Sequence, residues 1–298
     1  MGNILGELVS LATAICWTIT SLAFESAGKK VGSLPVNLIR LVIAFFLIGI
    51  FSFVRSGLFV ASDASLNAWG WLAISGIIGF VIGDLLLFQA FVVVGARVSM
   101  LIMALTPPIA AFFGWIILNE QMSVSGLIGM TVTIIGIALV IMAKETNSRA
   151  VKIRYPVKGI LLAFGGAVGQ GLGLVFSKLG MKDYDPFLST QIRILAGIIG
   201  FAILFFALGK WKSVFSAVTN KRAMASISIG AVFGPFLGVS LSLLAIQHTT
   251  TGIASTIMAI VPVLIIAPAV IVFKEKITPK EIAGAVVAFA GVVMFFIF

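Results

Sequence analysis

One apolar block occurs twice in the chain, and this repeat constrains the fold more than any other feature. The first copy, Gly95–Glu120, is a long apolar segment with Pro107 near its middle and a glutamate at its end. The second copy, Thr249–Glu275, carries Pro262 and Glu275 at matching places, at a constant offset of 155 residues. Nearer the amino end an offset of 153 residues relates the two halves. The chain is therefore the duplication of one ancestral unit.

The composition excludes a soluble domain. Hydrophobic residues make up 60% of the chain and charged residues 10%, and the mean hydropathy is +1.21. Lipid must cover that much apolar surface. The net charge of +10 would suit nucleic acid, but the basic residues fall between apolar runs, where they face anionic lipid and set orientation. We expect a lipid bilayer and a small-molecule substrate as partners, no nucleic acid, and a monomer or homodimer.

Ten segments are long enough to cross a bilayer of about 30 Å as helices. Helices are expected because backbone polar groups in hydrocarbon need internal partners. The last segment begins with Thr278, Pro279 and Glu281 in the arrangement of a helix cap. The sequence predicts an all-α integral membrane protein with spans at about Ile4–Phe24, Leu34–Val54, Ala68–Phe88, Ala96–Leu118, Val124–Ala143, Val157–Leu179, Phe187–Leu208, Ala223–Ala245, Gly252–Phe273 and Pro279–Ile297.

These segments divide into a first five-helix repeat at residues 1–145, a basic linker at 146–156 and a second five-helix repeat at 157–298. Because five is odd, the second repeat enters the membrane from the opposite side, and the two halves are inverted. Inverted repeats are a recurrent basis for alternating access, with a site near the midplane where the repeats meet.

The basic residues predict the orientation. If the loops alternate between sides, fifteen lysines and arginines lie on one side and three, Arg55, Lys178 and Lys182, on the other. The positive-inside rule then puts the basic loops in the cytoplasm and both termini outside a multi-pass protein of the cytoplasmic membrane.

Asp84 is the one acid inside an apolar run away from the ends of that run. An intramembrane acid is costly, which makes it a candidate proton site or substrate anchor. The alternative is a structural ion pair with Arg97 across the short loop. Position 239, which corresponds to Asp84 in the second repeat, is a valine, so the acid breaks the internal symmetry.

Other uncommon residues recur in both halves. Pro107 and Pro262 each remove a backbone donor within a span, which predicts kinks that shape a cavity or are simply tolerated. Glycines repeat every four residues in the third and eighth spans, which predicts close helix packing. Trp17 and Gln170 are equivalent at mid-span and would face each other across the cavity if the halves meet there, although ordinary packing explains them as well.

With these motifs in view, the chain resembles the drug/metabolite transporter superfamily, EamA-type branch. The matching pieces are Pro107 to Glu120 with its following glycine helix, Pro262 to Glu275 with its own, and the arginines Arg40 and Arg193. The resemblance implies ten helices, two five-helix repeats and a central cavity lined by the first, third, fourth, sixth, eighth and ninth helices. Further candidates on these helices are Ser99, Met103, Phe236, Ser255 and Met258.

The charged residues shared with the family have two interpretations each. Arg40 and Arg193 would attract a carboxylate or phosphate, or they would reach a headgroup layer or cap neighbouring helices. We interpret Glu120 and Glu275 as interfacial anchors rather than catalytic groups.

Three functional classes follow from these observations. A secondary transporter, most simply an exporter of amino acids or related compounds with protons as a candidate coupling ion, fits the inverted duplication best. A carrier of nucleotide sugars or other metabolites is the alternative within transport. An integral membrane enzyme is weaker, because no metal cluster, nucleophile–base set or phosphate loop is present in the sequence. A channel or a purely structural subunit, the third class, would not need the inverted duplication. We therefore expect no catalytic residue, no metal site and no cofactor.

Overall fold

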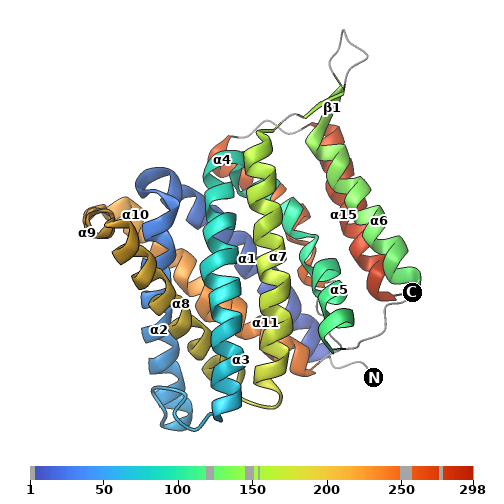
Figure 1. Cartoon of the computed structure of the whole chain (residues 1–298). Coiled ribbons are helices and arrows are strands. Elements are labelled where there is room, and N and C mark those ends of the chain that lie inside the picture. Colours follow the sequence, from blue (N-terminus) through green and yellow to red (C-terminus); the bar gives the residue numbers. More distant parts are fainter. Residues whose placement is uncertain are drawn as a thin grey trace.

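The computed structural model describes residues 4–118, 124–144, 151–153, 155–248, 257–274 and 278–297. These residues form a bundle of helices with one small hairpin projecting from one end (Figure 1). The first half contains α1 (Ile4–Val31), α2 (Ser33–Ser56), α3 (Leu66–Gly76), the π-helix η1 (Ile77–Gly83), α4 (Asp84–Met103), α5 (Thr106–Leu118) and α6 (Val124–Ile141). The second half contains α7 (Val157–Met181), α8 (Pro186–Leu208), α9 (Trp211–Thr219), α10 (Lys221–Ala231), the π-helix η2 (Val232–Gly238), α11 (Val239–His248), α13 (Val261–Leu264), α14 (Ile266–Phe273) and α15 (Pro279–Ile297).

Six helical stretches are long and apolar enough to cross a membrane by length and composition, and three shorter apolar helices accompany them. The count of ten spans therefore stays a prediction. The third and fourth predicted spans join in one stretch, Leu66–Met103. Gly95 interrupts this stretch with φ 83° and ψ 160°, a backbone conformation that glycine adopts without a steric penalty. The predicted fourth span begins directly after this break.

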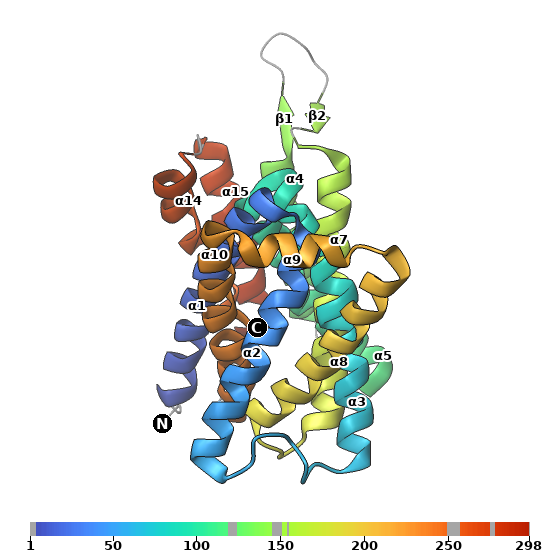
Figure 2. The same cartoon turned by 90° about the vertical axis from the view of Figure 1, so that its left-hand side faces the viewer.

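Two elements depart from the predicted arrangement. The link between the halves contains an antiparallel hairpin of β1 (Met142–Lys144) and β2 (Val151–Ile153), in which Met142 pairs with Ile153. This hairpin is an exception to the all-α prediction. Helix α9 lies across the bundle where a loop was expected (Figure 2). Its Val214 and Ala217 pack inward while Phe215 is exposed, so this short amphipathic helix, flanked by lysines, was missed because it resembles a charged loop.

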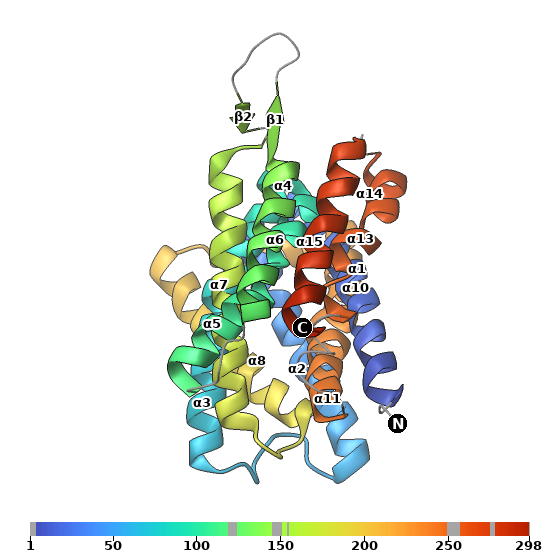
Figure 3. The ribbon, with the colours of Figure 1, turned by 90° about the vertical axis from the view of Figure 1, so that its right-hand side faces the viewer.

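Equivalent helices of the two halves run in opposite directions. In Figure 1, α6 rises toward the hairpin whereas α15 descends to the C-terminal end, and α1 and α7 are related in the same way. The described chain begins and ends away from the hairpin (Figure 3). The two repeats are thus antiparallel, as the odd number of predicted spans requires.

Helices α6 and α15 pack side by side through glycines (Figure 3). A Cβ atom at Gly284 would lie 2.8 Å from the carbonyl oxygen of Gly136, and one at Gly291 would lie 2.8 Å from that of Gly129. Since Gly129 is equivalent to Gly284 and Gly136 to Gly291, these two contacts are related by the internal symmetry. Small residues here let the two backbones approach closely, which stabilises helix pairs in lipid.

The first helix of each half crosses the third span of the other half. In one crossing the Ser75 hydroxyl donates to the Gly173 carbonyl at 2.6 Å. In the equivalent crossing the Thr20 hydroxyl donates to the Gly230 carbonyl at 2.8 Å. Ser75 is equivalent to Gly230 and Thr20 to Gly173, so the two crossings use equivalent positions. The hydroxyl donor lies on the third span in the first crossing and on the first helix of its half in the second crossing. They bind the repeats to each other on both sides of the molecular centre.

The predicted cap of the last helix is confirmed. Helix α15 begins at Pro279, and the Glu281 carboxylate accepts from the Thr278 backbone N–H at 2.7 Å and from its hydroxyl at 2.9 Å. This satisfies a donor that the first turn of the helix leaves unpaired.

Candidate functional site

A cavity of about 500 Å³ lies between the two antiparallel repeats. Its wall is built from α1, η1 and α4, α5, α7, η2 and α11, and the segment around α13. These are the six spans that the family resemblance implies. The second span of each half adds one arginine, Arg40 and Arg193. The volume lies within the range typical of small-molecule sites.

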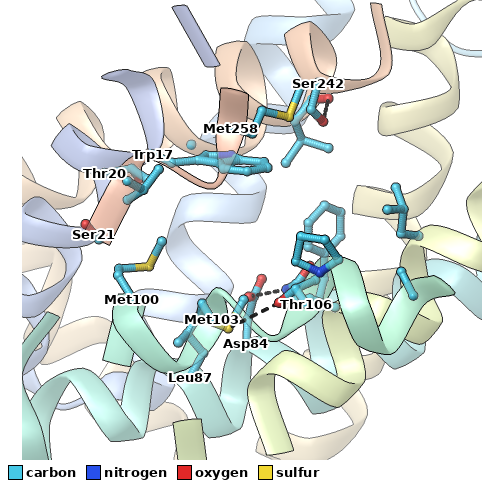
Figure 4. Close-up of a pocket in the computed structure, with 18 of the residues that line it drawn as sticks. Trp17, Thr20, Ser21, Asp84, Leu87, Met100, Met103, Thr106, Ser242 and Met258 are labelled. Carbon is cyan, nitrogen blue, oxygen red and sulfur yellow. Dashed lines mark hydrogen bonds between the residues drawn. The ribbon is translucent and has the colours of Figure 1, made fainter. Parts of the chain in front are cut away.

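Most of the wall is apolar, and the close-up shows two opposing sides. Trp17, Met258 and Ser242 lie on one side, and Asp84, Leu87 and Met103 lie on the other (Figure 4). Aromatic and thioether side chains adapt to ligands of different shape. The cavity is thus suited to the apolar part of a small amphipathic molecule.

The polar centre of the wall is the Asp84 carboxylate, at the junction of η1 and α4. Its Oδ2 atom accepts from Arg40 Nη2 at 2.5 Å and its Oδ1 atom from Gln170 Nε2 at 2.6 Å. Arg40 Nε also donates to Asn37 Oδ1 at 3.3 Å, and Asn37 donates to the Asp84 backbone carbonyl. Three spans, α2, α4 and α7, therefore meet at this buried network.

The prediction that Asp84 pairs with Arg97 is wrong. Arg97 Nη1 lies 3.2 Å from Glu281 Oε1, and the Tyr155 hydroxyl donates to the same oxygen at 2.5 Å. The break at Gly95 sets Arg97 on a new helical segment, which faces α15 rather than Asp84. Arg40, 44 residues earlier in the chain than Asp84, takes the role that was assigned to Arg97.

Arg193 is the equivalent of Arg40 in the second half, but its surroundings differ. Its side chain is buried, its guanidinium lies over the Phe80 ring at 4.8 Å, and it lines the cavity. In the described part of the chain its Nε atom has no hydrogen-bond partner. Both arginines are at most 4% exposed, so the interpretation that they extend to a headgroup layer is wrong.

The structure brings several other predicted residues to the cavity and excludes two. The residues in its wall are Trp17, Met103, Pro107, Gln170, Met258 and Pro262. Ser99 is instead buried and donates to the Gly95 carbonyl at 2.8 Å. Phe236 lies against Phe51 and Phe187, with ring centroids 5.9 and 6.4 Å away. Ser255, Glu120 and Glu275 lie outside the described residues.

A helical break lies beside each of the two equivalent prolines, Pro107 and Pro262. Helix α4 ends at Met103 and α5 begins at Thr106, directly before Pro107. Helix α13 begins at Val261, directly before Pro262. Each proline thus occupies the first turn of a new helix, where its missing N–H costs no hydrogen bond. Thr106, at the first break, donates to the Met103 sulfur at 3.9 Å beside the cavity (Figure 4).

Glu25 makes a structural contact near the cavity-lining helix α4 that sequence reasoning missed. Helix α1 continues to Val31, so Glu25 lies within it and is fully buried. Its Oε2 atom accepts from the Ala96 backbone N–H at 2.8 Å, and its other oxygen pairs with Lys29. A carboxylate at the new helix start after Gly95 stabilises the break, because helix N-termini carry partial positive charge. The signal was present in the sequence as an acid one residue past the predicted span.

Comparison with known proteins places this arrangement in a family. The model of the EamA-like transporter family matches residues 4–142 and again residues 157–297. The chain belongs to the EamA-like transporter family. The two matches fall one on each antiparallel half, so the cavity is the space between two EamA-like units.

Relatives of this EamA-like protein carry transporter names. An "Uncharacterized transporter" of Clostridium kluyveri is 24% identical over 290 residues, covering 96% of this chain and 91% of that protein. "Uncharacterized transporter YvbV" of Bacillus subtilis is 24% identical over 179 residues, covering 60% of this chain and 55% of that protein. A solved crystal structure covers 97% of this chain and 95% of its own at a TM-score of 0.62 and 16% identity, which supports the fold alone.

Among the described residues, no group of three or more His, Cys, Asp or Glu side chains is arranged to hold a metal ion. The polar groups of the EamA-like cavity wall include the Asp84 carboxylate, the Gln170 amide, the guanidinium groups of Arg40 and Arg193, and the buried hydroxyls of Thr20 and Ser21, which recognise ligands by charge and hydrogen bonding.

Proposed function

We propose that this EamA-like transporter is a secondary transporter that exports amino acids or related compounds by alternating access. The observation that carries the proposal is the cavity between two antiparallel repeats, lined by equivalent spans of both. A site at the interface of inverted repeats can face either side of the membrane when the repeats exchange conformations.

The crossings of α7 with η1 and of α1 with η2 supply a route for this exchange of conformations. Gly83 of η1 packs against Gln170 of α7, and Gly238 of η2 packs against Trp17 of α1, which are equivalent contacts in the two halves. Gln170 and Trp17 both lie in the cavity wall. A tilt at one crossing and the reverse tilt at the other would open one side of the cavity and close the other.

The composition of the cavity favours compounds of amino-acid size over nucleotide sugars. The wall is largely apolar, and Arg40, one of its basic groups, is already paired with Asp84. A nucleotide sugar carries two phosphate charges and would need several free basic partners. Compounds with a small polar end and an apolar body match this wall better.

The direct test is transport by the purified protein in proteoliposomes. Vesicles are loaded with one unlabelled amino acid, related carboxylate or nucleotide sugar, and counterflow of its radiolabelled form is measured against protein-free vesicles. We expect counterflow of amino acids or related carboxylates with an apolar body, and mass spectrometry to recover each compound unchanged. Failure of every compound to move, or recovery of a chemically altered product, would contradict carriage and favour a membrane enzyme.

Proton coupling at Asp84 is a second part of the proposal. Among the described residues of the cavity wall, Asp84 is the only carboxylate. We expect transport by the wild-type protein to vary with pH, and Asp84→Asn to remove that variation. An Asp84→Asn protein with unchanged activity and an unchanged pH profile would reject the coupling role, leaving Asp84 as the ion-pair partner of Arg40.

A further inference from the structure

We infer that Arg193 binds the carboxylate of the transported molecule, and that, among the amino acids and related compounds of the proposed function, the preferred substrates are monoanions that carry one carboxylate and no ammonium group on an apolar body. The inference rests on the proposed function, and it assigns the substrate class of the same cavity. Three observations carry it: the unsatisfied guanidinium of Arg193, the charge balance of the network and the internal symmetry.

The first observation is the environment of the Arg193 side chain. It is 4% exposed, and its Nε atom is buried without a hydrogen-bond partner in the described part of the chain. Its Nη2 atom lies over η1, 3.3 Å from where a Cβ atom at Gly79 would be, so the glycine makes room for it. A buried cation without hydrogen bonds is costly unless a partner satisfies it. The cavity that Arg193 lines is the route by which such a partner arrives.

The second observation is the charge balance. Arg40 and Arg193 place two buried positive charges at the cavity, and Asp84, which is ion-paired with Arg40, places one negative charge there. Lys178, the other basic residue of the wall, is exposed. Both oxygens of Asp84 are occupied, one by Arg40 and the other by Gln170. One positive charge therefore remains, and a ligand with one negative charge neutralises it. A phosphate dianion would leave an uncompensated negative charge in the same buried place.

The third observation comes from the duplication. Arg40 and Arg193 are equivalent positions, as are Asp84 and Val239. In the first half the protein supplies the carboxylate that binds the arginine. In the second half that position is a valine, whose side chain lines the same cavity as Arg193. The substrate carboxylate completes in the second half the ion pair that Asp84 makes in the first.

The apolar wall accounts for the remainder of the ligand. Met103 and Met258 belong to opposing sides of the cavity, with Trp17 beside Met258 (Figure 4). Phe88 adds further aromatic surface to the wall. An alkyl or aryl body between these side chains gains from burial of its apolar area. Arg193 then serves to orient the bound molecule through charge-assisted hydrogen bonds.

The test uses ligand pairs that differ only in the charged group. Binding of 3-phenylpropanoate and 3-phenylpropanamide, and of 4-methylpentanoate and 4-methylpentanamide, is measured on the purified full-length protein by calorimetry. We expect each carboxylate to bind about tenfold or more tightly than its amide, because a charge-assisted hydrogen bond is lost in the amide. Equal binding within both pairs overturns the inference, and so does tighter binding of phenyl phosphate than of 3-phenylpropanoate.

Two kinds of variant locate the carboxylate. Arg193→Gln is expected to abolish the difference within each pair, and Arg193→Lys to retain part of it. Val239→Asp supplies a carboxylate from the protein and is expected to abolish carboxylate binding, while its uncharged control Val239→Asn keeps the preference. Arg55→Gln, which changes an exposed arginine outside the cavity, is expected to bind as the wild type does. An undiminished preference in both Arg193→Gln and Val239→Asp overturns the inference.

Counterflow of the same compounds in proteoliposomes separates this inference from the proposed function. Carboxylate-selective binding at Arg193 without movement of any probe would contradict the carrier and leave the anion site intact. Movement of the amides as fast as the carboxylates would support the carrier and contradict the anion site.

Discussion

Arg40 and Asp84 form a buried ion pair in the cavity wall, with Arg40 Nη2 2.5 Å from Asp84 Oδ2. The guanidinium is also stacked near aromatic rings, 4.6 Å from the Phe88 centroid and 5.5 Å from that of Phe80. The pair joins α2 to the start of α4, directly after the π-helix η1. It therefore holds the polar centre of the cavity in place.

Breaking this pair is expected to destabilise the folded protein. Arg40→Met leaves the Asp84 carboxylate buried without its counter-ion, at a cost of about 3–5 kcal/mol in the free energy of unfolding. The double variant Arg40→Met/Asp84→Leu removes both charges and should recover most of this loss. Unfolding of the variants in mixed detergent micelles measures the effect. A double variant as unstable as the sum of the single variants would contradict a direct pair.

The matched control is an ion pair at the surface. Arg55 Nη1 lies 2.7 Å from Asp185 Oδ2, and its side chain is 57% exposed. Because water screens such a pair, Arg55→Gln should change the free energy of unfolding by less than about 1 kcal/mol.

The packing of α6 on α15 predicts that Gly136 tolerates no side chain. A Cβ atom at Gly136 would lie 2.3 Å from the Ala288 backbone nitrogen. Gly136→Ala should therefore force the helices apart and destabilise the protein by about 1–3 kcal/mol. Gly70→Ala on α3 is the control, since a Cβ atom there meets nothing within 4 Å, and alanine favours the helix by up to about 1 kcal/mol. Thermal unfolding in detergent distinguishes the two, and equal effects would contradict the close crossing.

Tyr184 predicts an alkaline limit to stability. It lies in the connection between α7 and α8, and its hydroxyl donates to the Asp63 carboxylate. Burial raises the pKa of Tyr184 above its ordinary value, and the hydrogen bond to Asp63 and the charge of Asp185 raise it further. Because the folded-state pKa is raised, the stability from this group is fully present below about pH 10 and is lost as the pH rises through the raised value.

The chain has two tyrosines, so this prediction can be measured on one residue. In a Tyr155→Phe variant the ultraviolet absorbance of phenolate reports Tyr184 alone. Its titration midpoint should lie above that of free tyrosine, and Asp63→Asn should lower it. A midpoint at the ordinary value would show that the contact with Asp63 does not persist in solution.

The orientation can be tested with single cysteines, because the one native cysteine, Cys16, is buried. Lys212 on α9 and Ser62 between α2 and α3 are both exposed and belong to opposite ends of the bundle (Figure 2). The positive-inside rule puts the basic end in the cytoplasm. In a Cys16→Ser background, a membrane-impermeant maleimide should label Ser62→Cys in intact cells and Lys212→Cys only after lysis. The reverse pattern would place both termini in the cytoplasm.

What the sequence by itself determined is local or repeated. The apolar runs, the cap at Thr278 and Glu281, and the breaks at Pro107 and Pro262 follow from short-range chemistry, since each depends on residues within one or two helical turns. The constant offset between the halves, with an odd number of predicted spans in each, predicted that the halves run in opposite directions.

Only the tertiary structure decided which buried charges meet. Asp84 binds Arg40 rather than Arg97, and Glu25 caps the helix that starts at Ala96. Such pairs depend on the rotation and depth of whole helices, which continuous apolar segments leave undetermined because every face of such a helix is similar. The positive φ of Gly95 and the extension of α1 to Val31 set those rotations. The same packing left Arg193 without the carboxylate that its counterpart has, because position 239 is a valine.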